Sequence, residues 1–282
     1  MLNGTLKVLR KFLQLMAALI LFYPIGSQAQ MNATRSNSFN HAQWDELLGL
    51  YVVPINEGKS SVVDYQGLNS QRNQLSSYLE SIAAISEQEF DRWTDDDQLA
   101  FLINAYNAWT VEFILTAWPD IASIKELGSF FSSPWEKEFV ELFGRLLSLD
   151  EIEHELIRGS GNYNDPRIHF AVNCASIGCP ALRAEAYDGD LLDYQLEQQA
   201  SLFLMDRSRN RVENNSIQLS PIFKWYREDF EKGWLGINRL EDFVILHARD
   251  LGLNNSVMNG LRNRSVKFKF LKYDWRLNKL QQ

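Results

Sequence analysis

Apolar residues recur at helical spacing through much of the chain. Between residues 68 and 85, Leu75, Leu79 and Ile82 fall on one face of a helix. The strongest pattern covers residues 94–118. There, Thr94 and the aspartates after it form an expected N-terminal cap, and the following residues are apolar nearly all round, as in a buried helix. Further helices are predicted at residues 41–53, 191–204, 221–230 and 240–251.

Strand patterns are fewer and shorter. Residues 138–147 mix branched and aromatic side chains around Gly144, which predicts a hairpin. Residues 210–219 are expected to pair as strands, and 265–273 alternate as a C-terminal strand. The apolar run at 167–174 predicts a buried strand. Because no long linker interrupts this order, we predict one helix-rich α+β domain with a small sheet over residues 41–282.

The N-terminus has the pattern of a secretory signal peptide. Lys7, Arg10 and Lys11 precede an apolar run at 12–23, and small residues end the segment at Ala29. A membrane anchor is the rival interpretation, but a spanning helix needs roughly 20 apolar residues. We therefore expect a signal peptide at 1–29, a flexible lead-in at 30–40, and a periplasmic or secreted protein.

The net charge of the chain argues against some classes of partner. The whole chain carries a formal charge of −8, and the predicted signal contributes only positive charges, so the mature chain is more acidic still. An acidic protein has no overall attraction to nucleic acid or to anionic lipid. We expect no nucleic acid partner and no stable membrane insertion after signal cleavage. The partner is an unknown small molecule, peptide or protein.

Two asparagines stand out in the apolar helix. Asn104 and Asn107 are three residues apart, so their amides share one helical face. A buried amide without partners costs about 1–3 kcal/mol, so both need hydrogen bonds. Either they bond to nearby backbone or buried water, or they line or brace a pocket.

A second polar group follows a capping box. Ser148 and Glu151 match the S-x-x-E pattern and predict a helix through about residue 158. His154 and Arg158 lie four residues apart on this helix. They form either a solvated polar face or part of a site.

The third group lies in residues 167–180. Cys174 ends the predicted strand before a turn of small residues that includes Ser176, which places its sulfur as a nucleophile beside backbone N–H groups. His154 or His169 would be the base, although a regular strand puts His169 and Cys174 on opposite faces. The alternatives for Cys174 are a buried thiol or a disulfide with Cys179.

Zinc is a further alternative for the same segment. His154, His169, Cys174 and Cys179 are residue types that zinc binds, but their spacing is not that of a standard finger. We predict no metal and no cofactor.

Five blocks of the sequence resemble one family, called domain of unknown function 547. They occur in the family's order and lie at residues 101–107, 148–158, 165–180, 220–230 and 273–278. The family includes exported bacterial proteins, and the resemblance implies no activity. The positions that match its motif are Asn104, Asn107, His154, Arg158, His169, Cys174, Ser176 and Pro180. The family tolerates serine in place of Cys179, which implies that a disulfide is not obligatory.

Two functions remain open. The first is a Cys–His hydrolase or acyltransferase, with Cys174 as nucleophile, His154 or His169 as base, Asn104 or Asn107 as an orienting or oxyanion group, and Arg158 and Ser176 as binding residues. The second is a non-catalytic periplasmic binding or assembly module, with residues 222–230 as a docking surface. A free thiol beside an imidazole in an open pocket favours the enzyme. A Cys174–Cys179 disulfide favours the module.

Overall fold

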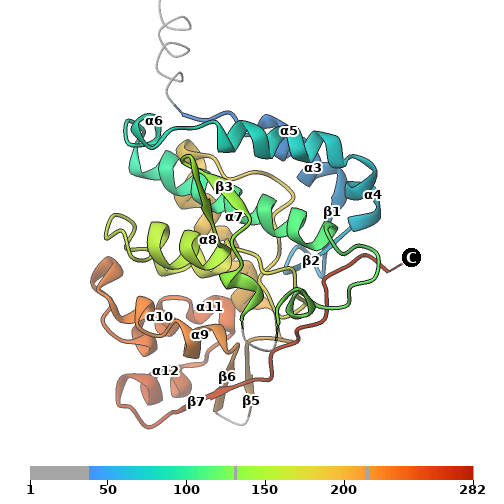
Figure 1. Ribbon diagram of the computed structural model, residues 1–282. Helices are drawn as coiled ribbons and strands as arrows, with labels where there is room; N and C mark the ends of the chain where they lie inside the picture. Colours follow the sequence, from blue (N-terminus) through green and yellow to red (C-terminus); the bar gives the residue numbers. More distant parts are fainter. Residues whose placement is uncertain (1–37, 130–131, 214–215, 282) are drawn as a thin grey trace, which may run out of the picture. The chain divides into compact units, whose positions relative to one another are not determined.

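A computed structural model describes residues 38–129, 132–213 and 216–281 (Figure 1). The predicted signal peptide and most of the predicted lead-in lie outside these residues. The chain divides into two units, of which the second is Phe39–Gln282. Within the described residues, no helix is both long and apolar enough to cross a membrane.

Helix α7 (Asp95–Leu115) is the centre of the larger core. The Thr94 hydroxyl accepts from the Asp97 backbone N–H at 3.1 Å, and three aspartates occupy the first turn, so the helix begins as predicted. Almost every side chain from Gln98 to Leu115 is buried, which confirms a helix apolar nearly all round. It ends three residues before the predicted end.

Shorter helices pack around α7 in the same unit (Figure 1). The predicted helix at 68–85 is interrupted at Gln71, whose backbone leaves helical geometry (φ −109°, ψ 23°). A hairpin that we did not predict follows the first helix and turns through Asn56 and Glu57, which both have positive φ. These elements are α3 (Ala42–Tyr51), β1 (Val52–Ile55), β2 (Ser60–Val63), α4 (Tyr65–Ser70), α5 (Arg72–Ala83) and α6 (Glu87–Phe90).

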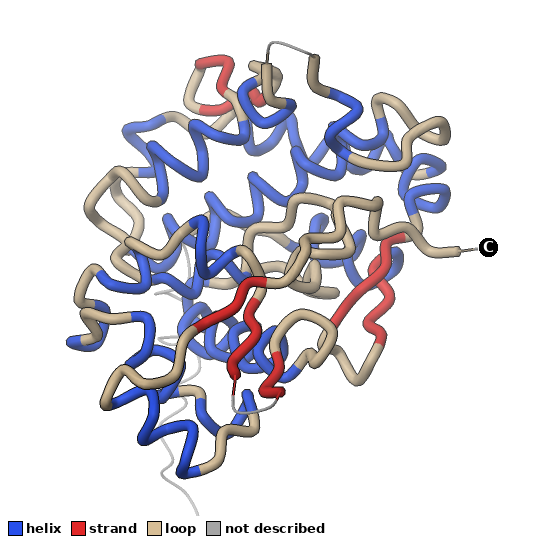
Figure 2. Tube along the Cα trace, turned by 90° about the horizontal axis from the view of Figure 1, so that it is seen from below, coloured by secondary structure: helices blue, strands red, loops and turns tan. Residues whose placement is uncertain are grey.

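The strands form small separate sheets, which Figure 2 shows as short pieces between helices and loops. The predicted hairpin is present as β3 (Val140–Leu142) and β4 (Arg145–Leu147). Strands β5 (Arg211–Glu213) and β6 (Ser216–Leu219) pair antiparallel as predicted. Strand β7 (Phe268–Phe270) adds to β6 in parallel and is shorter than the predicted 265–273. The helix-rich α+β fold class is confirmed.

A second, phenylalanine-rich core lies under the C-terminal helices. Phe170, Phe203, Phe223 and Phe243 are all fully buried in it. The predicted helix at 221–230 is reduced to single turns, α9 (Ile222–Trp225) and a 3-10 turn at Asp229–Glu231. The other helices of this core are α8 (Leu192–Met205), α10 (Leu240–Leu246), α11 (Ala248–Leu251) and α12 (Asn255–Arg262).

The segment at 167–174 is not a strand, so that prediction was wrong. Pro166–Phe170 is a 3-10 helix, which Asp165 caps by accepting from the Arg167 backbone N–H at 2.9 Å. The Asp-Pro pair starts a helical turn, and burial of the whole turn explains why its residues are apolar. The parity argument that separated His169 from Cys174 therefore does not apply.

The last residues form an extended strap, 271–280, that runs back from β7 over the domain. Its backbone bonds to three distant segments: Gly178 N–H donates to Asp274, Leu277 N–H to Ala122, and Leu280 N–H to Val63. In Figure 1 the strap is the red chain that rises from β7 towards β2. It carries Tyr273 and Trp275 to the segment that contains the two cysteines.

Candidate functional site

A pocket of about 180 Å³ lies where the strap crosses the cysteine segment. Six aromatic side chains, two carboxylates, one imidazole and both cysteines line it. Its residues come from distant parts of the chain, and tertiary folding alone brings them together. They are Tyr106, Trp135, Asp150, Glu153, His169, Val172, Cys174, Cys179, Pro180, Ile222, Trp225, Tyr226, Tyr273 and Trp275.

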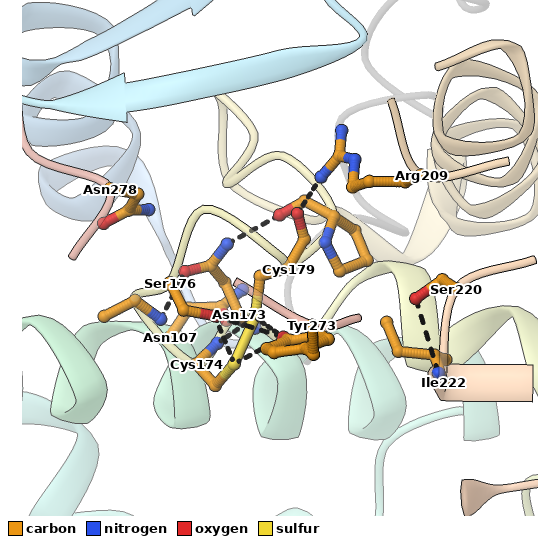
Figure 3. The surroundings of a disulfide bond; sticks show 12 residues. Asn107, Asn173, Cys174, Ser176, Cys179, Arg209, Ser220, Ile222, Tyr273 and Asn278 are labelled. Atoms are coloured by element: carbon orange, nitrogen blue, oxygen red, sulfur yellow. Dashed lines mark hydrogen bonds between the residues drawn. A yellow bond between two sulfur atoms is a disulfide. The ribbon is translucent and has the colours of Figure 1, made fainter. Parts of the chain in front are cut away.

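Cys174 and Cys179 are joined by a disulfide, with 6.3 Å between their Cα atoms (Figure 3). The Cys174 backbone N–H donates to the Cys179 sulfur at 3.0 Å. The Tyr273 hydroxyl donates to the Cys179 sulfur at 3.2 Å and lies 3.2 Å from the Cys174 sulfur. Ser176 donates to that hydroxyl at 3.1 Å. In this state Cys174 has no free thiol.

The buried His169 ring lies between two carboxylates. Its Nε2 is 2.8 Å from Asp229 Oδ2, and its Nδ1 is 3.7 Å from Glu153 Oε1. Tyr226 stacks on the ring, with 3.8 Å between ring centroids. Arg158 donates to the same Asp229 oxygen at 2.5 Å, and its guanidinium lies over the outer part of this stack, 5.0 Å from the Tyr226 ring centre.

Hydrogen bonds within this network favour the charged forms of Asp229 and Glu153. Burial alone would raise the pKa of Asp229, but hydrogen bonds from His169, Arg158 and Lys232 outweigh it and hold that pKa far below its ordinary value. For Glu153, burial likewise opposes ionisation, and contacts with His169 overcome it, so its pKa is lowered. Burial raises the pKa of Asp150.

Two parts of the network are left without hydrogen bonds. Glu153 is 5% exposed and His169 is 2% exposed, yet Glu153 Oε1 and His169 Nδ1 have no hydrogen-bond partner. Both residues line the pocket. An unsatisfied buried polar atom is costly, so atoms of this kind at a pocket wall are candidates for ligand contact.

The two predicted asparagines lie elsewhere. Asn104 donates to the Tyr187 carbonyl at 2.8 Å and accepts from the Tyr187 N–H at 2.9 Å. Asn107 donates to the Ala171 carbonyl at 3.0 Å and accepts from the Asn173 N–H at 2.8 Å. Both are buried, as their cost predicts, but neither lines the pocket. Asn107 fixes the loop that leads to the two cysteines, and Asn104 fixes the loop at Tyr187, which does not line the pocket.

His154 also lies outside the pocket lining. The capping box is confirmed, since Ser148 and Glu151 exchange hydrogen bonds, although the helix that follows, Glu151–Ile157, is a π-helix. His154 contacts Arg158 at 2.7 Å and faces Asp150 at 3.5 Å. Of the two candidate bases, only His169 shares the pocket with Cys174.

Several site residues were not predicted. Asp150 lies within the capping box and Glu153 follows it, where both resemble ordinary polar positions of a helix. Tyr273 ends the predicted strand at 265–273, and Trp275 lies beyond it; both fall in the family-resemblance block at 273–278, for which no role was predicted. The aromatic stretch at 222–230 was predicted to be a docking surface. Among the described residues, no group of three or more histidine, cysteine, aspartate or glutamate side chains could hold a metal ion.

Comparison with known proteins supports the family resemblance over part of the chain. No curated protein and no solved structure matches the chain. The blocks at 220–230 and 273–278, which supply the aromatic side of the pocket, lie beyond the matched segment. Residues 90–204, which include Glu153, His169 and both cysteines, match the model of the family described as "Protein of unknown function, DUF547".

Proposed function

We propose that the pocket binds an organic cation of the size of one amino-acid side chain, as a non-catalytic binding module would. One observation carries the proposal: Glu153 is a buried side chain at the wall of an aromatic pocket, and its Oε1 faces His169 Nδ1 at 3.7 Å without accepting a hydrogen bond. An ammonium or guanidinium group would supply the missing donor and a compensating charge.

The aromatic walls suit the same ligand. Trp225 and Trp275 stack at 5.8 Å, and Trp135 lies 5.5 Å from Trp275. The faces of such rings attract cations, and the Lys125 ammonium already lies 4.9 Å from the Trp275 ring centre. Asp150 adds a second carboxylate to the lining.

The size of the pocket limits the ligand. Pockets for drug-sized molecules measure roughly 300–1,000 Å³. At about 180 Å³, this pocket accommodates a small amine or one side chain of a peptide.

A titration with four matched probes tests the proposal. Butylammonium and butylguanidinium should bind and change tryptophan fluorescence, while butanol and butyrate should not. Glu153→Gln should weaken cation binding about tenfold or more, as expected for one charge-assisted hydrogen bond. Glu141→Gln, on the exposed side of β3, is the matched control. Equal binding of butanol and butylammonium would refute the proposal.

One observation favours a second candidate, the predicted Cys–His hydrolase or acyltransferase. Cys174 and His169 line one pocket, and Asp229 holds the His169 ring in place. This activity requires reduction of the disulfide, because only a thiolate is a nucleophile.

The alkylation rate of Cys174 against pH, in a Cys179→Ser variant, tests this candidate. An inflection well below about 8.5 that disappears in His169→Ala supports the enzyme. An inflection at or above that value, unchanged by His169→Ala, leaves only the binding module.

A further inference from the structure

The two sulfurs of the disulfide differ in their surroundings. Cys174 is half-buried, whereas Cys179 is 4% exposed, and both line the pocket. Thiol–disulfide exchange begins when a thiolate attacks one sulfur and the other sulfur leaves. A thiol that enters the pocket therefore reaches Cys174 more easily, and Cys179 becomes the leaving group.

The leaving sulfur has hydrogen-bond donors in place. The Cys174 backbone N–H donates to the Cys179 sulfur at 3.0 Å, while the Tyr273 hydroxyl lies 3.2 Å from both sulfurs and can donate to whichever becomes a thiolate (Figure 3). Donors of this kind stabilise a thiolate, and a more stable leaving thiolate speeds exchange. The buried Arg209 guanidinium, which is paired with Asp206 at 2.6 Å, also donates to the Cys179 carbonyl oxygen and fixes the backbone of that residue.

We propose that Cys174–Cys179 is a reactive disulfide that exchanges with small thiols in the pocket. A thiolate attacks the Cys174 sulfur, the bond to Cys179 breaks, and its electron pair leaves on the Cys179 sulfur. A second thiolate then attacks the incoming group's sulfur and releases the Cys174 thiolate. Two thiols are oxidised to one disulfide, the protein disulfide is reduced to two thiols, and the two protons pass from the small thiols to the cysteines.

The pocket also selects among thiols. Asp150 and Glu153 line the approach to Cys174, so a thiol with an ammonium group should react faster than one with a carboxylate. This preference, unlike the exchange itself, rests on the proposed cation binding.

Mixing the oxidised chain with cysteamine or 3-mercaptopropionate tests both statements. The reaction is quenched with acid, and intact-mass and peptide analysis locate the mixed disulfide. Rates are expressed per thiolate and divided by those for hydroxyethyl disulfide, which removes the intrinsic difference between the two thiols. We expect the adduct on Cys174 and a rate above that of the reference disulfide.

The experiment distinguishes failure of the reactive-disulfide proposal from failure of the cation-binding proposal. An adduct on Cys179, or exchange slower than with the reference, overturns the reactive disulfide. Exchange on Cys174 at equal normalised rates for both thiols leaves the disulfide proposal standing and counts against cation binding.

Tyr273→Phe isolates the leaving-group donor. It keeps the ring and removes the hydroxyl, so we expect exchange to slow about tenfold, as for one lost hydrogen bond to a charged group. Tyr194→Phe, at an exposed tyrosine of α8, should leave the rate unchanged. The same rate in both variants would remove Tyr273 from the proposal, and the wild-type measurement stands whether or not Tyr273→Phe folds.

Discussion

Two regions of this molecule bury polar side chains. In one region these side chains are fully hydrogen-bonded, and in the other they are only partly hydrogen-bonded. Inside α7, Asn104 and Asn107 are 0% and 3% exposed, and each amide both donates and accepts a backbone hydrogen bond. At the pocket wall, Glu153 and His169 are as deeply buried, but each keeps a polar atom without a hydrogen-bond partner.

The difference separates side chains that have a structural role from side chains that are available to a ligand. A buried amide that satisfies two backbone groups stabilises the loop it holds, and nothing remains for a ligand. A buried carboxylate oxygen that accepts no hydrogen bond leaves an interaction that a ligand can make. Removing polar groups from the two regions should therefore have different effects on folding and on binding.

The largest effect on stability should come from α7. Asn107→Ala leaves the Ala171 carbonyl and the Asn173 N–H without partners, which should lower the free energy of unfolding by about 3 kcal/mol. Urea denaturation measures the loss. Asn73→Ala, at an exposed position of α5, is the control and should be nearly neutral. A loss below about 1 kcal/mol for Asn107→Ala would contradict the structural role.

Asp229 should have an intermediate effect that depends on pH. Its pKa is lower in the folded chain, so it stabilises the fold fully above the unfolded value of about 3.9, and this stabilisation is lost as the pH falls through the folded value. Asp229→Asn should cost about 2 kcal/mol at pH 7, because it leaves Arg158 and His169 without a carboxylate.

The free energy of unfolding of both proteins, measured from pH 7 down to pH 3, tests whether the charge of Asp229 causes the difference. The advantage of the wild type over Asp229→Asn should be constant down to about pH 4 and should shrink progressively below it. A difference that stays constant over the whole range would show that the carboxylate's charge is not the cause.

The smallest stability effect should come from Glu153. Glu153→Gln keeps the shape and removes the charge that faces His169 at 3.7 Å, but it breaks no hydrogen bond of Oε1, so the free energy of unfolding should fall by only about 1 kcal/mol. The same variant is expected to lose cation binding. If it destabilises the protein as much as Asn107→Ala, the contrast between the two regions fails.

The sequence predicted local elements better than it predicted the site. Thr94 and Ser148 marked the starts of two helices because capping uses residues close in sequence. Residues 167–174 were mistaken for a strand, since burial makes any short segment apolar. The spacing of Cys174 and Cys179 allowed both a bridge and a free thiol.

The pocket itself depends on contacts that no local pattern encodes. Glu153 and Trp275 meet only because the strap returns across the cysteine segment, held by the backbone bonds of Gly178 and Leu277. His169 and Cys174 share the pocket because Pro166–Phe170 is a 3-10 turn, which the strand prediction excluded. The sequence identified Asn104 and Asn107 as residues that need hydrogen-bond partners, but it did not identify those partners.

The strap also determines when, during synthesis of the chain, the pocket can be completed. A ribosome makes residues 90–204 long before it makes Tyr273 and Trp275, so the nascent chain can bury α7 while the pocket still lacks one wall. The two cysteines can therefore meet before the Tyr273 hydroxyl lies beside them. The proposed ligand binding would therefore require that synthesis has passed Trp275 and that the strap has docked.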